Sequence, residues 1–490
     1  MGLRTEAVFE PIEIEKALGW RVFRLADTER AKTVSDNDLR EIVQMKSGKR
    51  VYVQKAIPEL SSHEARLLRS ALEQYRGAHS KSFAGPHDAF LEFCKSSNIA
   101  LDEAQAQYLR RVILCISSQA GVLSAFLEDE SLEEIAVIGI GRHRPVHVFD
   151  CAFGWLETNI YFSSEEEVRN IVNAMASGIG RRITFQKPRI NAVLSDGSRL
   201  NACIEPASVS GPCVTIRKFR KKPFTPSDLI KSGTVSAQMM AFLWMAMQAD
   251  CSLLVCGNTG SGKTTLLNSL FNFVPATERI IIVEETPEVN VPHAHVVRLA
   301  TAEGIEIGMQ ELIVNTLRMR PDRVLVGEVR DRSELGALID TLLAGQGKGS
   351  YATFHAQSAA DAIARMRNMG TLESDLAALD IILVQRRWSS YSAGAASEER
   401  RLVSVCAVEE GSAGALAQDM FSYDFKGKEF ISHGISGRVL EKICRAFGIG
   451  KKEFQSELCE REEFLRTLEG KGGEEFFAAI QNYGKGDARN

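Results

Sequence analysis

Residues 253–264 read Leu253-Leu254-Val255-Cys256-Gly257-Asn258-Thr259-Gly260-Ser261-Gly262-Lys263-Thr264. The first four residues predict a buried apolar strand, and the last eight match the pattern GxxxxGK[ST]. Glycines let the backbone curve so that its N–H groups point at phosphate oxygens, and a helix N-terminus adds a favourable dipole. We therefore predict a phosphate-binding loop that continues through Thr264 and Thr265 into a helix over 264–271.

Two side chains of this loop carry specific chemistry. The Lys263 ammonium is suited to the β and γ phosphates of a nucleotide, and the Thr264 hydroxyl is suited to Mg²⁺. Because glycine makes up near 7% of residues in general, a chance match in a chain of this length has a probability of roughly 0.02. The sequence therefore predicts a nucleotide site with Mg²⁺.

Strands alternate with helices from 227 to about 432, which predicts a mainly parallel α/β sheet. The strands expected besides 253–256 cover 280–283, 324–326 and 351–354. Because the carboxyl ends of such strands face the ligand, polar residues that follow them are candidates for the site.

Acidic residues follow two of these strands. Glu284, Glu285 and Glu288 come directly after the strand over 280–283, and each is a candidate to activate water or to tune Mg²⁺. Which of the three is the base stays open. Glu328 ends the strand over 323–328 and is a candidate to hold Mg²⁺ through water or to orient the attacking water.

Three basic residues complete the set of candidates. His355 follows the strand over 351–354 and is either a γ-phosphate sensor or an ordinary core or surface histidine. Arg199 and Arg217 precede the phosphate-binding loop in the chain. Arginine neutralises the charge that develops in phosphoryl transfer, but from the residues alone a solvated basic strand is the preferred interpretation of both.

Four regions are expected along the chain. Residues 1–118 form a mostly helical N-terminal region that opens with strands at 21–25 and 50–55. Residues 119–222 form a mixed α/β lobe, and a Pro-containing hinge over 221–226 leads into an ATPase-type α/β domain over 223–432. Residues 433–490 form a small helical appendage. The polar stretch 389–397 is expected to be an exposed loop, and Asp322 to be structural.

Composition excludes several classes of protein. The chain carries 59 Lys and Arg against 63 Asp and Glu, and this near balance provides no overall basic footprint for nucleic acid. The longest apolar stretch, 239–247, is too short to span a membrane, and the first residues do not resemble a signal peptide. The ten cysteines include no CxxC pair. We expect a cytoplasmic protein without a zinc site.

Four motifs together are similar to the Walker A, Asp box, Walker B and His box of the type II/IV secretion ATPases, and they occur in that order. They are Gly257–Thr264, Glu284–Glu288, Met319–Arg330 and Ala352–Ala356. Residues 195–201 and 215–219 resemble the segments that precede this core in the branch of archaeal pilus and archaellum motors. Residues 120–390 carry the resemblance well, and the two ends carry it loosely.

The resemblance implies a RecA-like core, preceded by an N-terminal lobe, that assembles into a homohexameric ring around ATP. It implies that Arg199 and Arg217 contact nucleotide phosphates, that the acidic candidates are catalytic carboxylates, and that His355 is the His-box histidine. The expected function is a cytoplasmic ATPase motor that hydrolyses ATP, with Mg²⁺, for protein secretion or assembly of a type IV pilus-like filament. The expected partner is a polytopic inner-membrane platform protein, through which alone the motor contacts the membrane.

The chain departs from the family pattern at two motifs. Glu285 stands where the family usually has Asp, and Gly345-Gln346-Gly347 stands where a first histidine is usual, so a two-histidine mechanism is not expected. The alternative reading is a nucleic-acid translocase on the same core, which the pI of about 6.2 disfavours because a translocase needs a basic channel. An ATP-binding scaffold without turnover is a third reading, against which the complete loop and Glu328 argue.

Overall fold

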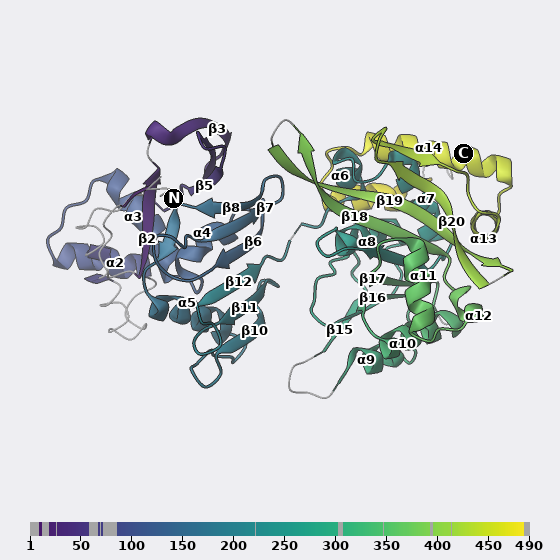
Figure 1. Cartoon of the computed structure of the whole chain (residues 1–490), viewed down its shortest axis with the longest axis horizontal. Coiled ribbons are helices and arrows are strands. Elements are labelled where there is room, and N and C mark those ends of the chain that lie inside the picture. The colour runs from purple at the N-terminus through teal and green to yellow at the C-terminus, as the bar shows by residue number, and fades with distance from the viewer. Residues whose placement is uncertain are drawn as a thin grey trace, which may run out of the picture. The chain divides into compact units, whose positions relative to one another are not determined.

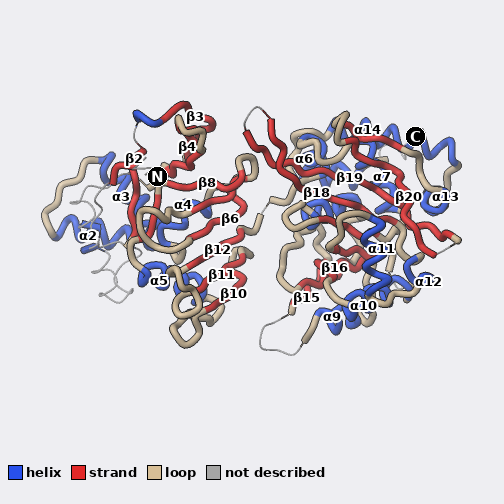
Figure 2. Tube along the Cα trace, viewed as in Figure 1, coloured by secondary structure: helices blue, strands red, loops and turns tan. Residues whose placement is uncertain are grey.

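The computed structural model describes residues 9–11, 19–25, 27–57, 67–68, 70–71, 86–220, 222–301, 307–345, 347–392, 395–412 and 414–484. The chain divides into two compact units, Met1–Arg220 and Lys221–Asn490 (Figures 1 and 2). The boundary falls at the start of the hinge predicted over 221–226, of which residue 221 lies outside the described residues. Each unit has its own hydrophobic core.

The first unit is built on a nine-stranded sheet with the order β10-β11-β12-β6-β7-β8-β5-β4-β3. All neighbours are antiparallel except β5 and β8. The strands are β3 (Arg30–Asp36), β4 (Arg40–Met45), β5 (Arg50–Gln54), β6 (Leu132–Val137), β7 (His147–Asp150), β8 (Gly154–Thr158), β10 (Arg189–Val193), β11 (Arg199–Cys203) and β12 (Cys213–Arg217). A smaller sheet joins β1 (Phe9–Pro11), β2 (Trp20–Leu25) and β9 (Ile160–Phe162).

Helices complete the first unit. They are α2 (Pro86–Ser96), α3 (Glu103–Ser117), α4 (Ser124–Leu127) and α5 (Glu165–Ser177). Helix α5 begins where the Ser164 hydroxyl accepts a hydrogen bond from the N–H of Glu167, and its buried residues join the core of the unit. The sequence pattern of residues 182–185 favours a strand, but these residues form a loop. A helical pattern over 62–75 falls mostly outside the described residues.

Strands β3 to β5 join the N-terminal region to the lobe that follows it in the chain. They extend the same sheet as β6 to β12, so the boundary expected at 118/119 separates no compact units. Buried polar contacts hold them there: the Tyr52 hydroxyl donates to Asp129 (2.9 Å), and the Arg40 guanidinium donates to Asp150 (2.6 Å). Local sequence patterns do not show such partners because these residues are 77 and 110 positions apart.

The second unit is built on a nine-stranded sheet with the order β15-β14-β16-β17-β13-β18-β19-β20-β21. Strands from β15 to β18 are parallel neighbours, and β19 to β21 continue the sheet in antiparallel fashion. The strands are β13 (Leu253–Gly257), β14 (Ile280–Glu284), β15 (Val296–Ala300), β16 (Arg323–Val329), β17 (Ser350–Phe354), β18 (Ile381–Ser392), β19 (Ala395–Gly411), β20 (Gly414–Asp424) and β21 (Glu429–Ser432).

Helices cover both faces of this sheet (Figure 1). Alternate residues of β13 enter opposite cores, since Leu253 and Val255 belong to one apolar cluster and Leu254 and Cys256 to the other. The helices are α6 (Pro226–Lys231), α7 (Ala237–Gln248), α8 (Lys263–Leu270), α9 (Met309–Thr316), α10 (Arg332–Leu343), α11 (Ala359–Asn368), α12 (Glu373–Leu376), α13 (Gly437–Phe447), α14 (Lys451–Thr467) and α15 (Gly473–Asn482). Within the described ranges, every helix is too short or too polar to cross a bilayer.

The prediction of an exposed loop over 389–397 is wrong. Its described residues continue β18 and β19 as a long antiparallel hairpin. Polar side chains link the two strands in this stretch: Arg387 pairs with Glu398 (2.6 Å), which also accepts a hydrogen bond from Ser389 (2.8 Å). Polarity alone therefore does not distinguish a loop from a ribbon held by cross-strand pairs.

The C-terminal helices are part of the second unit. Helix α14 packs against α7, and residues of α13, α14 and α15 lie in the same core as β13. The buried guanidinium of Arg461 lies 4.4 Å from the ring centre of Trp244, which also stacks on Phe273 at 5.2 Å. These helices were predicted from the sequence, whereas their docking on the sheet of the second unit depends on these long-range contacts.

Candidate nucleotide-binding site

The predicted phosphate-binding loop connects β13 to α8, as the motif requires. Gly257, Gly260 and Gly262 all have positive φ angles, of 153°, 71° and 95°. A Cβ atom at Gly257 would lie 1.9 Å from the carbonyl oxygen of Gln385 on β18, and one at Gly260 would lie 2.6 Å from Nη1 of Arg387. At Gly257 the backbone of β18 leaves no room for a side chain, and at Gly260 the left-handed φ favours glycine, so the loop forms a backbone cradle.

Lys263 begins α8 and lies folded over the loop. Its Nζ donates to the carbonyl oxygens of Gly257 (3.1 Å) and Asn258 (3.3 Å), and only 9% of the residue is exposed. These bonds place the ammonium inside the curve of the loop, where it also faces any phosphate bound to the N–H groups.

Two buried oxygens beside the cradle have no hydrogen-bond partner in the described structure. They are Oγ of Ser261 and Oε1 of Gln385, in residues that are 0% and 1% exposed. Since buried polar atoms are normally paired, this loop retains capacity for a polar ligand or its water. The cradle and the Ser261 hydroxyl, which can donate a hydrogen bond, fit a nucleotide phosphate, and the Gln385 oxygen can accept a hydrogen bond from water.

Glu288 is the Asp-box carboxylate that reaches the loop. Its Oε2 lies 3.4 Å from the Thr264 hydroxyl oxygen. A hydroxyl beside a carboxylate is an oxygen donor set of the kind Mg²⁺ prefers. Thr264 and Glu288 thus fit the ion that was predicted for this site.

Glu284 has a different position. It is buried at the end of β14, beneath the backbone of Glu288 and Val289. Its Oε1 accepts the backbone N–H groups of Glu288 and Val289, both at 2.8 Å. Burial raises the pKa of Glu284, and these two hydrogen bonds oppose the rise without cancelling it. Glu284 therefore holds the backbone that presents Glu288.

Gly327 makes room for Glu284. The strands β14 and β16 are parallel neighbours, and a Cβ at Gly327 would lie 2.9 Å from Cγ of Glu284. The pairing of β16 with β17 is irregular between Val326 and Val329, which turns the strand at Gly327 and Glu328. This irregularity sets the direction of the Glu328 side chain.

Glu328 contacts two basic groups at the same edge of the sheet. One oxygen lies against Nε2 of His355, and the other pairs with Arg330 at 2.7 Å. Arg330 also pairs with Glu285, which is exposed. Arg365 donates to the carbonyl oxygen of His355 and so fixes the end of β17. Glu328 and His355, which were predicted as separate candidates, thus lie together, and Arg330 joins Glu285 to them.

The β18–β19 hairpin supplies contacts that sequence patterns do not indicate. Asn258 exchanges two hydrogen bonds with the backbone of Arg387 (3.0 and 3.1 Å), and Nε of Arg400 donates to the Gly260 carbonyl (3.1 Å). The apolar run Ile381–Val384 is a signal for a strand here. Nothing local to Arg400 connects it with a loop 140 residues away.

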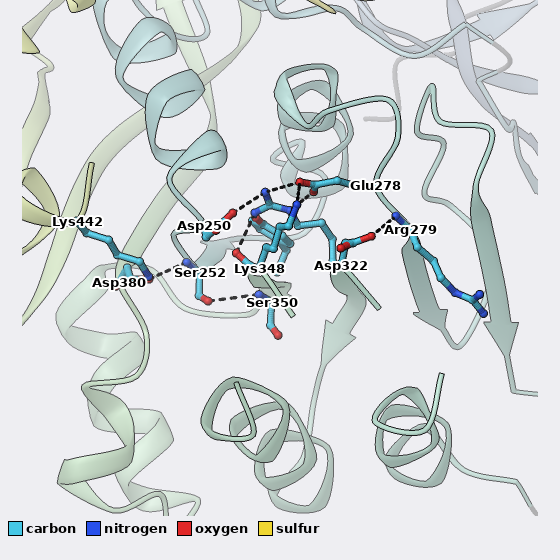
Figure 3. Close-up of polar contacts among 11 residues, drawn as sticks. Asp250, Ser252, Glu278, Arg279, Asp322, Lys348, Ser350, Asp380 and Lys442 are labelled. Atoms are coloured by element: carbon cyan, nitrogen blue, oxygen red, sulfur yellow. Dashed lines mark hydrogen bonds and ion pairs between the residues drawn. The ribbon is translucent and has the colours of Figure 1, made fainter. Parts of the chain in front are cut away.

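A buried polar network lies at the amino ends of the parallel strands (Figure 3). Arg323, 1% exposed at its side chain, pairs with Glu278 (2.6 Å) and Asp250 (2.8 Å) and donates to the Tyr351 hydroxyl (2.7 Å). Lys348 adds a second cation to Glu278 at 2.7 Å. Its positive charges are paired with negative ones, and it lies at the edge of the sheet away from the phosphate-binding loop. We therefore interpret the network as structural.

Asp322 lies at the same edge of the sheet. Its Oδ2 accepts the N–H of Arg279 at 2.8 Å (Figure 3), which joins β16 to the start of β14. The expectation that Asp322 is structural is confirmed. Asp380 joins the start of β18 to the start of β13, because its carboxylate accepts the N–H of Ser252 (2.8 Å). It also pairs with Lys442 (2.7 Å).

Arg199 and Arg217 lie in the first unit, whereas the phosphate-binding loop lies in the second. They are direct partners across β11 and β12, and Arg217 is also opposite Glu134 of β6. Neighbouring Lys218 is not part of an open basic patch, because its Nζ donates to the carbonyls of Phe126 (3.2 Å) and Asp129. Burial lowers the pKa of Lys218 to about 8.

Known proteins share the central part of this chain. A family model described as "Type II/IV secretion system protein" matches residues 137–439. An uncharacterised protein of Methanocaldococcus jannaschii is 33% identical over 319 residues, which cover 62% of this chain and 44% of that protein. The type IV secretion system protein VirB11 of Bartonella quintana is 30% identical over 317 residues, which cover 54% of this chain and 87% of that protein.

The chain is also similar to part of a solved structure. The VirB11 ATPase from the Brucella suis type IV secretion system, solved with sulphate, is 24% identical and covers 58% of this chain and 94% of its own, with a TM-score of 0.29. The chain spans only 44% of the length of each of two M. jannaschii relatives.

Proposed function

The chain belongs to the type II/IV secretion system protein family, and from this premise we propose that it is an ATPase motor. It hydrolyses ATP to drive protein secretion or assembly of a type IV pilus-like filament. It works as a cytoplasmic homohexamer that contacts the membrane through a polytopic platform protein. The observation that carries the proposal is the meeting of Thr264 with Glu288 beside a complete phosphate-binding loop.

Each group of the site has a distinct role in this proposal. The N–H groups of the loop and the Lys263 ammonium bind the β and γ phosphates. Thr264 and Glu288 hold Mg²⁺, which when bound neutralises phosphate charge. Glu288 also accepts the proton of the attacking water, since its carboxylate lies beside the start of α8, whereas the oxygen of Glu284 is occupied by two backbone N–H groups.

Glu328 and His355 form the second part of the proposed catalytic group. Their side chains are in contact and partly exposed at the carboxyl ends of β16 and β17. In this position His355 hydrogen-bonds the γ-phosphate and Glu328 orients the water or holds Mg²⁺ through water. Arg330 keeps Glu328 in place by a pair at 2.7 Å.

Arg199 and Arg217 complete the site from the first unit of a neighbouring subunit. The basis is their juxtaposition: two guanidinium groups on directly opposed residues form a concentrated positive charge, which suits a polyphosphate. This role requires assembly of several subunits.

ATP turnover with and without Mg²⁺, in the wild type and in Lys263→Ala, tests the proposal. We expect Mg²⁺-dependent turnover in the wild type and a loss of roughly 100-fold or more in the variant, because a phosphate contact that strengthens in the transition state is removed. Circular dichroism of the variant controls for folding. Variant turnover within a few-fold of the wild type contradicts the assignment of the loop.

A further inference from the structure

Two cysteines face each other across a pair of strands in the first unit. Cys203 ends β11 and Cys213 begins β12, and the two residues are direct partners in the antiparallel register. Direct partners have their side chains on one face of the sheet, with Cβ atoms roughly 4.5–5.5 Å apart. A disulfide needs Cα atoms about 4.4–6.8 Å apart, which both kinds of antiparallel pair satisfy, and Cβ atoms about 3.5–4.5 Å apart, which pairs at the closer end of the cross-strand spacing reach.

Both thiols are accessible from solvent. Cys203 and Cys213 are free and partly exposed, and they stand opposite each other across β11 and β12. Cys251 and Cys256, by contrast, are buried at 0% exposure in the core of the second unit. Cys203 and Cys213 therefore combine proximity to a second thiol with access from solvent.

The pair closes the neck of a surface loop. Residues 204–212 connect the two strands, and Val209 within them is 91% exposed. Arg199 and Arg217 lie on the same two strands, four residues from the respective cysteines, and therefore on the same face. A covalent link at the neck would hold both the loop and the strand register that places these arginines.

We propose that Cys203 and Cys213 form a cross-strand dithiol that a low-molecular-weight disulfide oxidises to an intramolecular disulfide. One thiolate attacks a sulfur of the small disulfide, which releases one small thiol and leaves a mixed disulfide. The second cysteine thiolate then displaces the other small thiol. Two cysteine thiols and one small disulfide thus become one protein disulfide and two small thiols.

Mass spectrometry tests this directly. Cleavage after Arg199 and Arg217 releases residues 200–217 as one tryptic peptide that contains both cysteines. The full-length protein is reduced, treated with oxidised glutathione, alkylated and digested. Because burial and the neighbouring Cys213 raise the pKa of Cys203, the reaction is run at mildly alkaline pH. We expect this peptide to lose the mass of two hydrogens, to take up no alkylating reagent, and to recover two alkylated cysteines after reduction.

Two controls keep the test decisive. Cys213→Ser leaves one thiol, so the same treatment should stop at a stable glutathione adduct on Cys203. Exposed Cys459 reports that the reagent is active. The proposal is overturned if the wild-type peptide keeps a glutathione adduct, or keeps two alkylatable thiols, while Cys459 reacts.

Discussion

The Thr264 hydroxyl oxygen lies 3.4 Å from Oε2 of Glu288, and this contact joins the first turn of α8 to the loop after β14. This contact distinguishes Glu288 from the other two acidic candidates that follow β14, Glu284 and Glu285. Glu284 is buried under the backbone and Glu285 pairs with Arg330 in an exposed position, so Glu288 alone of the three contacts the phosphate-binding segment in the described structure.

We predict different outcomes for two neighbouring carboxylates. Glu288→Gln should lower ATP turnover by about 10²–10⁴-fold, because the amide cannot accept a proton, while nucleotide binding persists. Glu285→Gln removes one partner of an exposed ion pair and should leave turnover within about threefold. Steady-state turnover and binding of a fluorescent nucleotide measure both. Equal losses in the two variants contradict the assignment of the base.

Glu284 is predicted to make stability depend on pH. Its pKa is raised by burial, so the native state binds the proton more tightly than the unfolded chain, and stability falls as pH rises above the unfolded value of about 4.3. Glu284→Gln removes that charge and keeps an oxygen for the two N–H groups. Its Tm should exceed that of the wild type at pH 7 by a few degrees, about 2–4 °C per kcal/mol, and the difference should vanish near pH 4.

The matched variant for that experiment is Glu284→Ala. It removes the acceptor of both N–H groups, so its Tm should fall below that of the wild type at pH 7. Thermal unfolding followed by circular dichroism gives both values. A Glu284→Gln protein that is less stable than the wild type at pH 7 shows that the charged form is the one stabilised in the native state.

Arg400 is predicted to support the phosphate-binding loop. Arg400→Ala removes the donor to the Gly260 carbonyl and should raise the KM for ATP by roughly tenfold, the equivalent of one charge-assisted hydrogen bond. The control is Arg386→Ala, an exposed position on the same hairpin, which should leave KM unchanged. If both variants behave alike, the hairpin acts through its overall charge and not through this contact.

The ring is tested by mixing two inactive proteins. Arg217→Ala and Lys263→Ala should each lose turnover alone, whereas a mixed ring can pair an intact loop with an intact arginine of a neighbour. We expect recovered turnover on mixing, and wild-type turnover that rises faster than linearly with protein concentration because assembly follows mass action. Mixed rings that are shown to co-assemble and stay inactive contradict a role for Arg217 across subunits.

Much of the second unit could be predicted from local sequence. The glycine pattern at 257–264 and the apolar runs of β13, β14, β16 and β17 are confirmed, because strand burial and phosphate-loop geometry impose their own residue types within a few positions. The C-terminal helices α13 to α15 are confirmed for the same reason, since helical periodicity is a local signal.

Relationships between distant residues depended on the tertiary structure. Glu284, Glu285 and Glu288 have the same chemistry in the sequence. In the structure Glu284 packs against Gly327 and accepts the backbone N–H of Glu288, whose carboxylate faces Thr264. The polar hairpin that places Arg400 on Gly260 resembles a loop until its two strands pair. The sequence alone thus determined that this chain builds a phosphate-binding loop on a parallel sheet. Which side chains meet there was decided by register and close packing, which join residues far apart in the chain.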